Sequence, residues 1–143
     1  MILVKEISAE ETYDIRLKVL RNGINLPCQF DGDFDSDTFH LGVFEGNQLA
    51  GISSFVKTKK PSFDVEQYQL RGMATLPETR GKGYGKLMLQ KSFELLKNRS
   101  VKTIWCNARE IALHFYLKQD FKILGKPFDI DEIGIHYLLY KNF

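Results

Sequence analysis

Residues 68–86, YQLRGMATLPETRGKGYGK, decide the fold of this chain. The strand-like run Tyr68–Thr75 leads into three glycines at alternate positions, and a helix-like run follows them. Glycines let a ligand approach the backbone closely, and the first turn of a helix leaves N–H groups without partners inside the helix. Arg80, Lys82 and Lys86 add formal charge to the positive end of the helix dipole. The stretch therefore predicts a binding site for a phosphate-bearing ligand.

Two familiar phosphate-binding motifs do not match this stretch. A P-loop requires Ser or Thr after its Gly-Lys pair, but Leu87 follows Gly85-Lys86, and Arg80 occupies the place of the first glycine. A dinucleotide-binding fingerprint requires its third glycine where Lys86 stands. The pattern that remains is R-x-x-G-x-G, from Arg80 to Gly85.

Length and composition describe an ordinary globular protein. The chain has 143 residues, of which 43% are hydrophobic and 27% charged, so we expect one domain spanning residues 1–143. No apolar run approaches the roughly 20 residues that span a bilayer, and charge appears too early at the amino terminus for a signal peptide. A net charge of +2 without a basic run argues against nucleic acid as a partner. Two cysteines suggest no disulfide framework, so we expect a cytoplasmic protein without membrane association.

Periodicity and turn signals predict the other elements. Met1–Glu6 alternates like a first strand, and Ser8–Glu11 forms a capping box for the helix that follows. The Gly46-Asn47 turn joins the strands Phe39–Glu45 and Gln48–Lys57 in a hairpin. The remaining predicted elements are a loop over 24–38, a helix ending near Asn98, a strand at Thr103–Cys106, a helix at Ile111–Lys118, and strands at Phe121–Leu124 and Gly134–Tyr140. This order is typical of a mixed α/β domain.

The R-x-x-G-x-G pattern after a strand resembles the pyrophosphate loop of the GNAT superfamily of N-acetyltransferases. Downstream, Asn107-Ala108-Arg109 with Ala112, Phe115-Tyr116 and Phe121 is similar to the family segment in which a strand and a helix flank the pantetheine arm. The family's Gly-Phe pair reads Asp120-Phe121 here, and aspartate tolerates the left-handed conformation that this glycine adopts. The resemblance covers nearly the whole chain. It implies a single α/β (mixed α+β) domain with a central, mixed but largely antiparallel twisted sheet of about six to seven strands and about four flanking helices.

The resemblance also implies that acetyl-CoA is the cosubstrate. The loop Arg80–Lys86, the glycine loop, would bind its pyrophosphate mainly through backbone N–H groups. The backbone of Met73 and Thr75 would pair with the pantetheine arm as another strand would. The alternative for Met73 and Thr75 is ordinary sheet pairing. The expected cofactor-binding residues are Met73, Ala74, Thr75, Arg80, Gly81, Lys82, Gly83, Tyr84, Gly85, Lys86 and Asn107.

Tyr116 stands where members of the family often carry the general acid. A phenol there can donate a proton to the departing thiolate, whereas the alternative is a half-buried helix tyrosine that packs through its ring. Many relatives have a glutamate base on the strand before the glycine loop, but this chain has Gln69, which is no base, so the base is left unassigned. Asn107 either hydrogen-bonds the pantetheine arm or the substrate, or it caps the following helix.

Three residues are candidates for the acceptor side, namely Gln69, Arg71 and His136. Arg71 shares the side-chain parity of Gln69, and it either clamps a substrate carboxylate through a bidentate pair or balances an acidic side chain. His136 is either a pH-sensitive substrate contact or base, or a structural residue of the last strand. Cys106, in an apolar strand, is expected to pack inertly. The three histidines share no metal-ligand spacing, so we expect no metal.

These features predict an enzyme that transfers an acetyl group from acetyl-CoA to a primary amine by direct attack in a ternary complex. The acceptor, a small molecule or a peptide, would enter on the side of the first helix, the basic loop Lys57–Lys60 and the last hairpin. Two alternatives stay open, a non-catalytic module that binds or senses acyl-CoA and a transferase that uses another acyl-CoA such as succinyl-CoA. A monomer and a homodimer are both compatible with the sequence.

Overall fold

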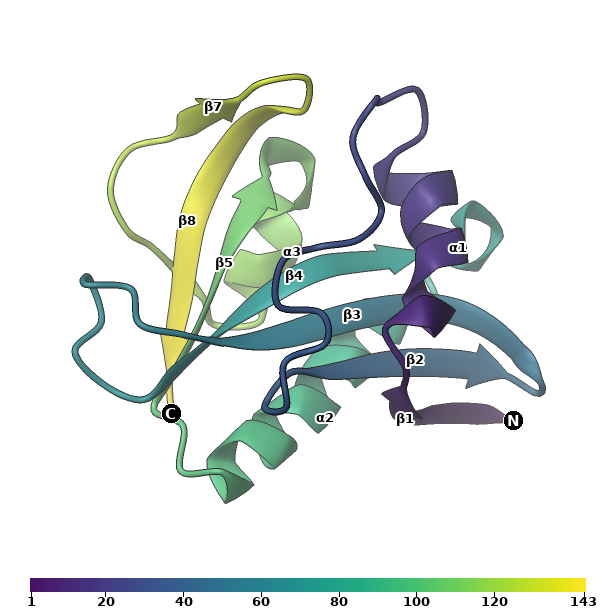
Figure 1. Cartoon of the computed structure of the whole chain (residues 1–143), viewed down its shortest axis with the longest axis horizontal. Helices are drawn as coiled ribbons and strands as arrows, with labels where there is room; N and C mark the ends of the chain where they lie inside the picture. The colour runs from purple at the N-terminus through teal and green to yellow at the C-terminus, as the bar shows by residue number, and fades with distance from the viewer.

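The computed structural model describes residues 1–143, and its centre is one eight-stranded sheet (Figure 1). The strand order is β1-β2-β3-β4-β5-β8-β6, and β7 pairs with β8. All neighbouring strands are antiparallel except β4 and β5, which are parallel. The predicted mixed, largely antiparallel sheet is therefore confirmed, with eight strands in place of six to seven. The strands are β1 (Ile2–Ile7), β2 (Phe39–Glu45), β3 (Gln48–Thr58), β4 (Gln67–Thr75), β5 (Thr103–Arg109), β6 (Lys122–Ile123), β7 (Phe128–Ile130) and β8 (Gly134–Asn142).

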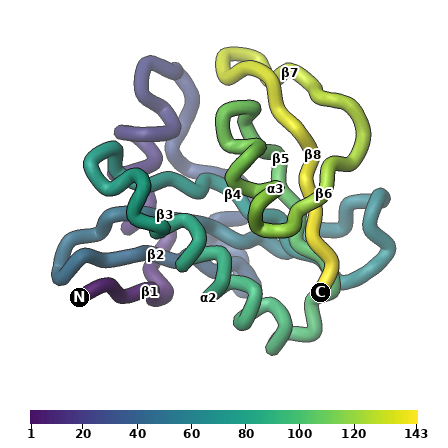
Figure 2. The backbone as a smooth tube through the Cα atoms, turned by 180° about the vertical axis from the view of Figure 1, so that it is seen from behind, coloured from purple at the N-terminus to yellow at the C-terminus, as the bar shows by residue number.

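The helical segments cover both faces of the sheet. In Figure 1 the α1 region lies in front of the strands, and the reverse view in Figure 2 has α2 and α3 nearest the viewer. The helical segments are η1 (Glu10–Thr12), α1 (Tyr13–Ile15), η2 (Arg16–Leu20), η3 (Pro77–Thr79), α2 (Tyr84–Asn98), η4 (Glu110–Ala112) and α3 (Leu113–Lys118). Three of them are α-helices, one fewer than predicted, because the other segments are short 3₁₀ or π turns. The predicted capping box forms, since the Ser8 and Glu11 N–H groups donate to each other's side-chain oxygens at 2.9 and 3.2 Å.

The main core lies between the sheet and the α2–α3 face. Leu89 and Leu96 of α2 are fully buried there against Leu41, Ile104 and other strand residues. Full burial of one such side chain stabilises the fold by about 1.5–3 kcal/mol. Asp120, which follows α3, adopts the predicted left-handed conformation with a φ of 67°. This core fixes α2, and with it the glycine loop, relative to β4 and β5.

The parallel strands β4 and β5 diverge along their length. They pair only where Gln67–Gln69 lies beside Thr103–Trp105, and beyond that point they diverge, as Figure 1 shows. Gly72 has a φ of +57°, and the β3–β4 register shifts opposite it. A Cβ atom at Gly72 would lie 2.8 Å from the Phe30 ring, so the close packing of this ring also requires glycine. The divergence leaves the carboxyl-terminal half of β4 unpaired on its β5 side.

A buried ionic network holds the loop over residues 21–38 on the front face. Arg16 is fully buried, and its guanidinium makes two hydrogen bonds to the Asp33 carboxylate at 2.7 and 3.0 Å. It also donates to the Cys28 carbonyl and the Ser54 hydroxyl, and the Phe30 ring stacks 3.8 Å from its central carbon. Removing one partner of a buried pair costs about 3–5 kcal/mol. The network therefore fixes the loop that faces β4.

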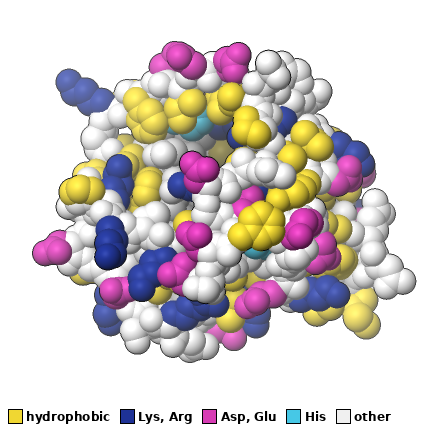
Figure 3. Space-filling view, viewed as in Figure 1, with side chains coloured by type: hydrophobic (Ala, Val, Ile, Leu, Met, Phe, Trp, Pro, Cys, Tyr) yellow, Lys and Arg dark blue, Asp and Glu magenta, His cyan; other side chains and the backbone are white.

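Several predicted boundaries change in the structure. Strand β5 continues past Cys106 to Arg109, because residues 103–109 all pair with β8. Strand β7, at Phe128–Ile130, was not predicted. Basic and acidic side chains are interspersed over the face drawn in Figure 3, in keeping with the net charge of +2. None of the helices has both the length and the apolar character required to cross a membrane.

Candidate functional site

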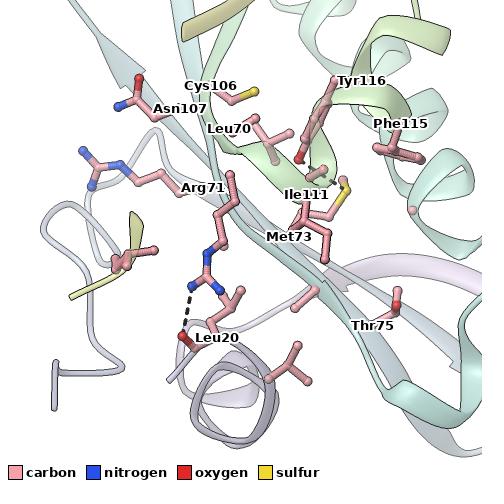
Figure 4. Close-up of a pocket in the computed structure, with 18 of the residues that line it drawn as sticks. Leu20, Leu70, Arg71, Met73, Thr75, Cys106, Asn107, Ile111, Phe115 and Tyr116 are labelled. Carbon is pink, nitrogen blue, oxygen red and sulfur yellow. Dashed lines mark hydrogen bonds between the residues drawn. The ribbon is translucent and has the colours of Figure 1, made fainter. Parts of the chain in front are cut away.

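A cavity of about 1120 Å³ opens where β4 and β5 diverge. Its walls come from the end of η2, the loop that follows it, β4, the glycine loop, β5, η4, α3 and the β7–β8 hairpin. Segments far apart in the sequence thus meet around one space. The lining includes most of the residues that the sequence singled out, and Figure 4 shows several of them.

The glycine loop presents unpaired backbone donors to this cavity. Gly81 and Gly83 have φ values of +83° and +80°, and a Cβ atom at either would meet nothing within 4 Å. No side chain caps α2, and its first hydrogen bond runs from the Leu87 N–H to the Gly83 carbonyl at 3.1 Å. The N–H groups of residues 81–86 consequently have no acceptor within the chain. Such a run of N–H groups at the positive end of a helix can hold an anion.

The side chains of the loop play different parts. Lys82 and Tyr84 both turn away to Glu45 at the end of β2, where Lys82 Nζ lies 2.8 Å from the carboxylate. Hydrogen bonds from Lys82 and then Tyr84 lower the pKa of Glu45, and the charge of Lys82 is largely offset. Arg80 is exposed and lines the cavity, whereas Lys86 is exposed but does not line it.

The third glycine of the loop serves packing. A Cβ atom at Gly85 would lie 3.1 Å from the Phe115 ring and 3.5 Å from the Met73 sulfur. Glycine at this position therefore lets the first turn of α2 approach α3 and β4 closely. The same approach brings the free N–H groups of the loop beside the end of β4.

Strand β4 turns alternate backbone groups toward the opening. The Leu76 N–H donates to the Ala50 carbonyl of the neighbouring strand at 2.9 Å, and Ala74, of the same parity, pairs with Ile52. Because antiparallel partners alternate in direction, the N–H and C=O groups of Met73 and Thr75 point to the opposite side, where β5 has moved away. The backbone groups of Met73 and Thr75 on this edge of β4 are therefore not paired with another strand of the sheet.

Tyr116 lies in the wall of the cavity beside Met73. Its hydroxyl points at the Met73 sulfur, 3.9 Å away, as Figure 4 shows, and this is its one hydrogen-bond partner. Burial raises the pKa of Tyr116 well above its usual value, so the phenol stays protonated. Burial also raises the pKa of the nearby Cys106 thiol, which makes Cys106 a poor nucleophile.

The three residues predicted for the acceptor side line the cavity together with Asn107, which was predicted to bind the cofactor. Asn107 is exposed inside β5, so the interpretation as a helix cap is wrong. Arg71 donates to Gln69 Oε1 at 2.9 Å and to the Asp31 backbone carbonyl at 2.7 Å. It has no carboxylate partner, so the interpretation that it balances an acidic side chain is also wrong. His136 is buried, and its Nδ1 lies 2.7 Å from the Gly134 carbonyl.

Sequence reasoning missed two arginines and misplaced one loop. Arg21 and Arg109 both line the cavity, and only the alternation from Asn107 to Arg109 along β5 hinted at the second. The first-helix region and the last hairpin line the cavity as predicted, but the basic loop Lys57–Lys60 does not. Its ends are held elsewhere, since Lys57 pairs with Glu66 and Lys60 lies over the Trp105 ring.

Comparison with known proteins identifies the family. A model of the acetyltransferase (GNAT) family matches residues 6–121 of the chain. The chain belongs to the GNAT family. It is 39% identical over 144 residues to the uncharacterized N-acetyltransferase YitI of Bacillus subtilis (strain 168), covering 99% of this chain and 97% of that protein.

Solved GNAT structures share the fold along the whole chain. The crystal structure of Escherichia coli ElaA has a TM-score of 0.80 at 18% identity and is matched over 99% of both chains. An aminoglycoside 6'-N-acetyltransferase complexed with coenzyme A has a TM-score of 0.73 at 12% identity, with 98% of this chain and 96% of that chain covered. Membership of the GNAT family shows that the chain is an acyltransferase, and coenzyme A is bound in a neighbour of the same fold.

Proposed function

We propose that this chain is a cytoplasmic N-acetyltransferase that moves an acetyl group from acetyl-CoA to a primary amine of a small molecule or peptide. The observation that carries the proposal is the run of free N–H groups at residues 81–86 beside the unpaired edge of β4. These two features lie in one cavity with Tyr116. Family membership supports acyl transfer, and the acetyl group and the amine are our own inference.

The residues present fit acetyl-CoA. The free N–H groups and Arg80 would hold the pyrophosphate, and the N–H and C=O groups of Met73 and Thr75 would hydrogen-bond the pantetheine amides. The side chains of Lys82 and Tyr84 would contribute little, because Glu45 already engages both. When bound, acetyl-CoA supplies a thioester that the amine attacks directly, with the coenzyme A thiol as leaving group.

Tyr116 is the proposed general acid. Its pKa is raised by burial, so it holds its proton at neutral and mildly alkaline pH, and its present acceptor is a thioether sulfur, which is a weak one. A thiolate formed near that hydroxyl would be a far stronger acceptor. Proton donation to the leaving group is therefore the role that the position of Tyr116 suits.

His136 is the proposed base. A carbonyl oxygen can only accept a hydrogen bond, so Nδ1 of His136 must donate to Gly134, which leaves Nε2 of the neutral ring as a proton acceptor. Of the other two acceptor-side candidates, Gln69 does not ionise and Arg71 stays protonated, and Asp31, the one carboxylate in the lining, is exposed. Replacement of His136 by glutamine should lower the rate of acyl transfer without lowering the affinity for acetyl-CoA.

Product analysis tests this proposal. Wild-type protein is incubated with acetyl-CoA and a panel of primary amines, free thiol is followed with a thiol reagent, and mass spectrometry identifies the acetylated amine. Turnover that depends on both substrates, with intersecting initial-rate lines, supports direct transfer. Binding of acetyl-CoA without transfer to any amine would favour the sensing module, and a higher rate with succinyl-CoA would favour the other acyl donor.

A further inference from the structure

The acceptor side of the cavity carries an excess of positive charge. Arg21, Arg71 and Arg109 line it together with Arg80 of the glycine loop, and Asp31 is the one acidic residue in the lining. None of the three acceptor-side arginines forms an ion pair in this structure. The protein as a whole is nearly neutral, so this concentration of charge is local.

Contacts between neighbouring residues bring the three guanidinium groups to one place. Arg109 Nη2 donates to the Leu20 carbonyl at 3.0 Å, directly beside Arg21 in the chain. The Arg21 guanidinium lies 5.2 Å from the Phe30 ring, and the next residue, Asp31, accepts from Arg71 Nη1 through its carbonyl. The three side chains thus come from the residue that follows η2, from β4 and from β5, but they line the same cavity.

Neutral acceptors orient these arginines without cancelling their charge. Arg109 donates one of its five N–H groups to the Leu20 carbonyl, and Arg21 donates through Nε to the Pro27 carbonyl. Arg71 donates two N–H groups, one to the Gln69 side chain and one to the Asp31 carbonyl. Each guanidinium therefore keeps N–H groups that no residue of the chain accepts. Arginine side chains that are oriented by carbonyl groups and keep free N–H donors are typical of a preorganised anion-binding site rather than of structural ion pairs.

Two members of this group, Arg21 and Arg109, repel each other. Burial, followed by the charges of Arg109 and Arg16, lowers the pKa of Arg21, and burial lowers the pKa of Arg109. Like charges in a partly desolvated space repel one another more strongly than in water. An anionic ligand removes this repulsion, whereas a polycationic amine increases it.

We propose that the acceptor amine carries a carboxylate, and that Arg21, Arg71 and Arg109 bind this carboxylate and direct the amine toward the reaction centre. The inference rests on the proposed function and specifies its substrate class. Guanidinium groups suit the task, because two parallel N–H bonds match the two carboxylate oxygens. Polyamines and other amines without a negative charge are then poor substrates.

A binding experiment without turnover tests this inference. Protein saturated with coenzyme A is titrated calorimetrically with a panel of N-acetyl amino acids, with their neutral carboxamides, and with spermidine. We expect at least one N-acetyl amino acid to bind about tenfold or more tightly than its carboxamide, since charge-assisted hydrogen bonds are lost in the amide. Equal binding of every acid and its amide, or a preference for spermidine, would overturn the inference.

Variants assign the carboxylate preference to the arginines. Arg109→Gln and Arg71→Gln should each remove most of the preference for the acid over the amide. Arg99→Gln is the matched control, because Arg99 also donates to a backbone carbonyl, that of Asp37, but lies outside the cavity. If the acid retains its preference in both cavity variants, the inference is wrong.

Coenzyme A binding separates this inference from the proposed function. The coenzyme is titrated first into every protein, and thermal unfolding shows which variants are folded. Folded wild-type protein that fails to bind coenzyme A would contradict the proposed function. Normal coenzyme A binding without any carboxylate preference would contradict only the carboxylate site.

Discussion

Replacing Tyr116 by phenylalanine should abolish most of the activity and leave the fold intact. The hydroxyl has a single partner, the Met73 sulfur at 3.9 Å. A full hydrogen bond contributes about 0.5–1.5 kcal/mol to stability, and a long one to sulfur contributes less, so the free energy of unfolding should change by less than about 0.5 kcal/mol. Loss of general acid catalysis should lower kcat by about 10²- to 10⁴-fold, which corresponds to roughly 3–5 kcal/mol in the activation free energy.

Steady-state kinetics, calorimetry and urea denaturation measure the three quantities on the same protein. The dissociation constant of acetyl-CoA should stay within about twofold of the wild-type value, since the contribution of Tyr116 is confined to proton donation. Tyr137→Phe is the control, because its hydroxyl bonds only Glu110, at 3.4 Å, outside the cavity. A kcat within about threefold of wild type would refute the assignment of Tyr116 as the acid, because general acid catalysis is worth far more than that.

Two further predictions concern the framework of the site. Gly72→Ala would place a Cβ atom 2.8 Å from the Phe30 ring, whereas at Gly46, where φ is similar, a Cβ atom would meet nothing within 4 Å. Gly72→Ala should therefore lower the free energy of unfolding by about 1–3 kcal/mol more than Gly46→Ala does. Chemical denaturation of the two variants measures this difference. For Asp33, burial alone would raise the pKa, but the hydrogen bonds from Arg16 and the Phe30 N–H outweigh it and lower the pKa. Its stabilising contribution is therefore complete above the unfolded-state pKa of about 3.8 and is lost as pH falls through the lower folded value, so unfolding curves of Asp33→Asn should lose this acid-side dependence.

Local signals in the sequence predicted much of the fold. The Gly46-Asn47 turn, the Ser8–Glu11 capping box and the proline and glycines around η3 each fix a backbone conformation through a few neighbouring residues. The left-handed Asp120 also follows from local chemistry. Strand β7 could not be predicted in this way, because it has three residues and exists through its pairing with β8.

In the candidate site, too, local features were predicted from the sequence and features that depend on long-range packing were not. The glycine loop is continuous in sequence, so its free N–H groups were predicted from spacing alone. Arg21 and Arg109 are 88 positions apart, and only the folded chain, in which Arg109 donates to the Leu20 carbonyl, shows that they share a cavity. The basic loop Lys57–Lys60 looked suited to an acceptor, but its contacts to Glu66 and Trp105 hold it outside. Long-range packing decided these cases.

Calorimetric titration with acetyl-CoA tests the central claim most directly. Wild-type protein is compared with Gly83→Glu and with Gly125→Glu, two positions of matching φ, +80° and +79°, with open space around the missing Cβ. Only Gly83 lines the cavity. We expect a wild-type dissociation constant in the range of about 1–100 µM, a loss of affinity of at least about 100-fold in Gly83→Glu, and an unchanged value in Gly125→Glu. Absence of binding by folded wild-type protein, or equal effects of the two substitutions, would contradict the acyl-CoA site.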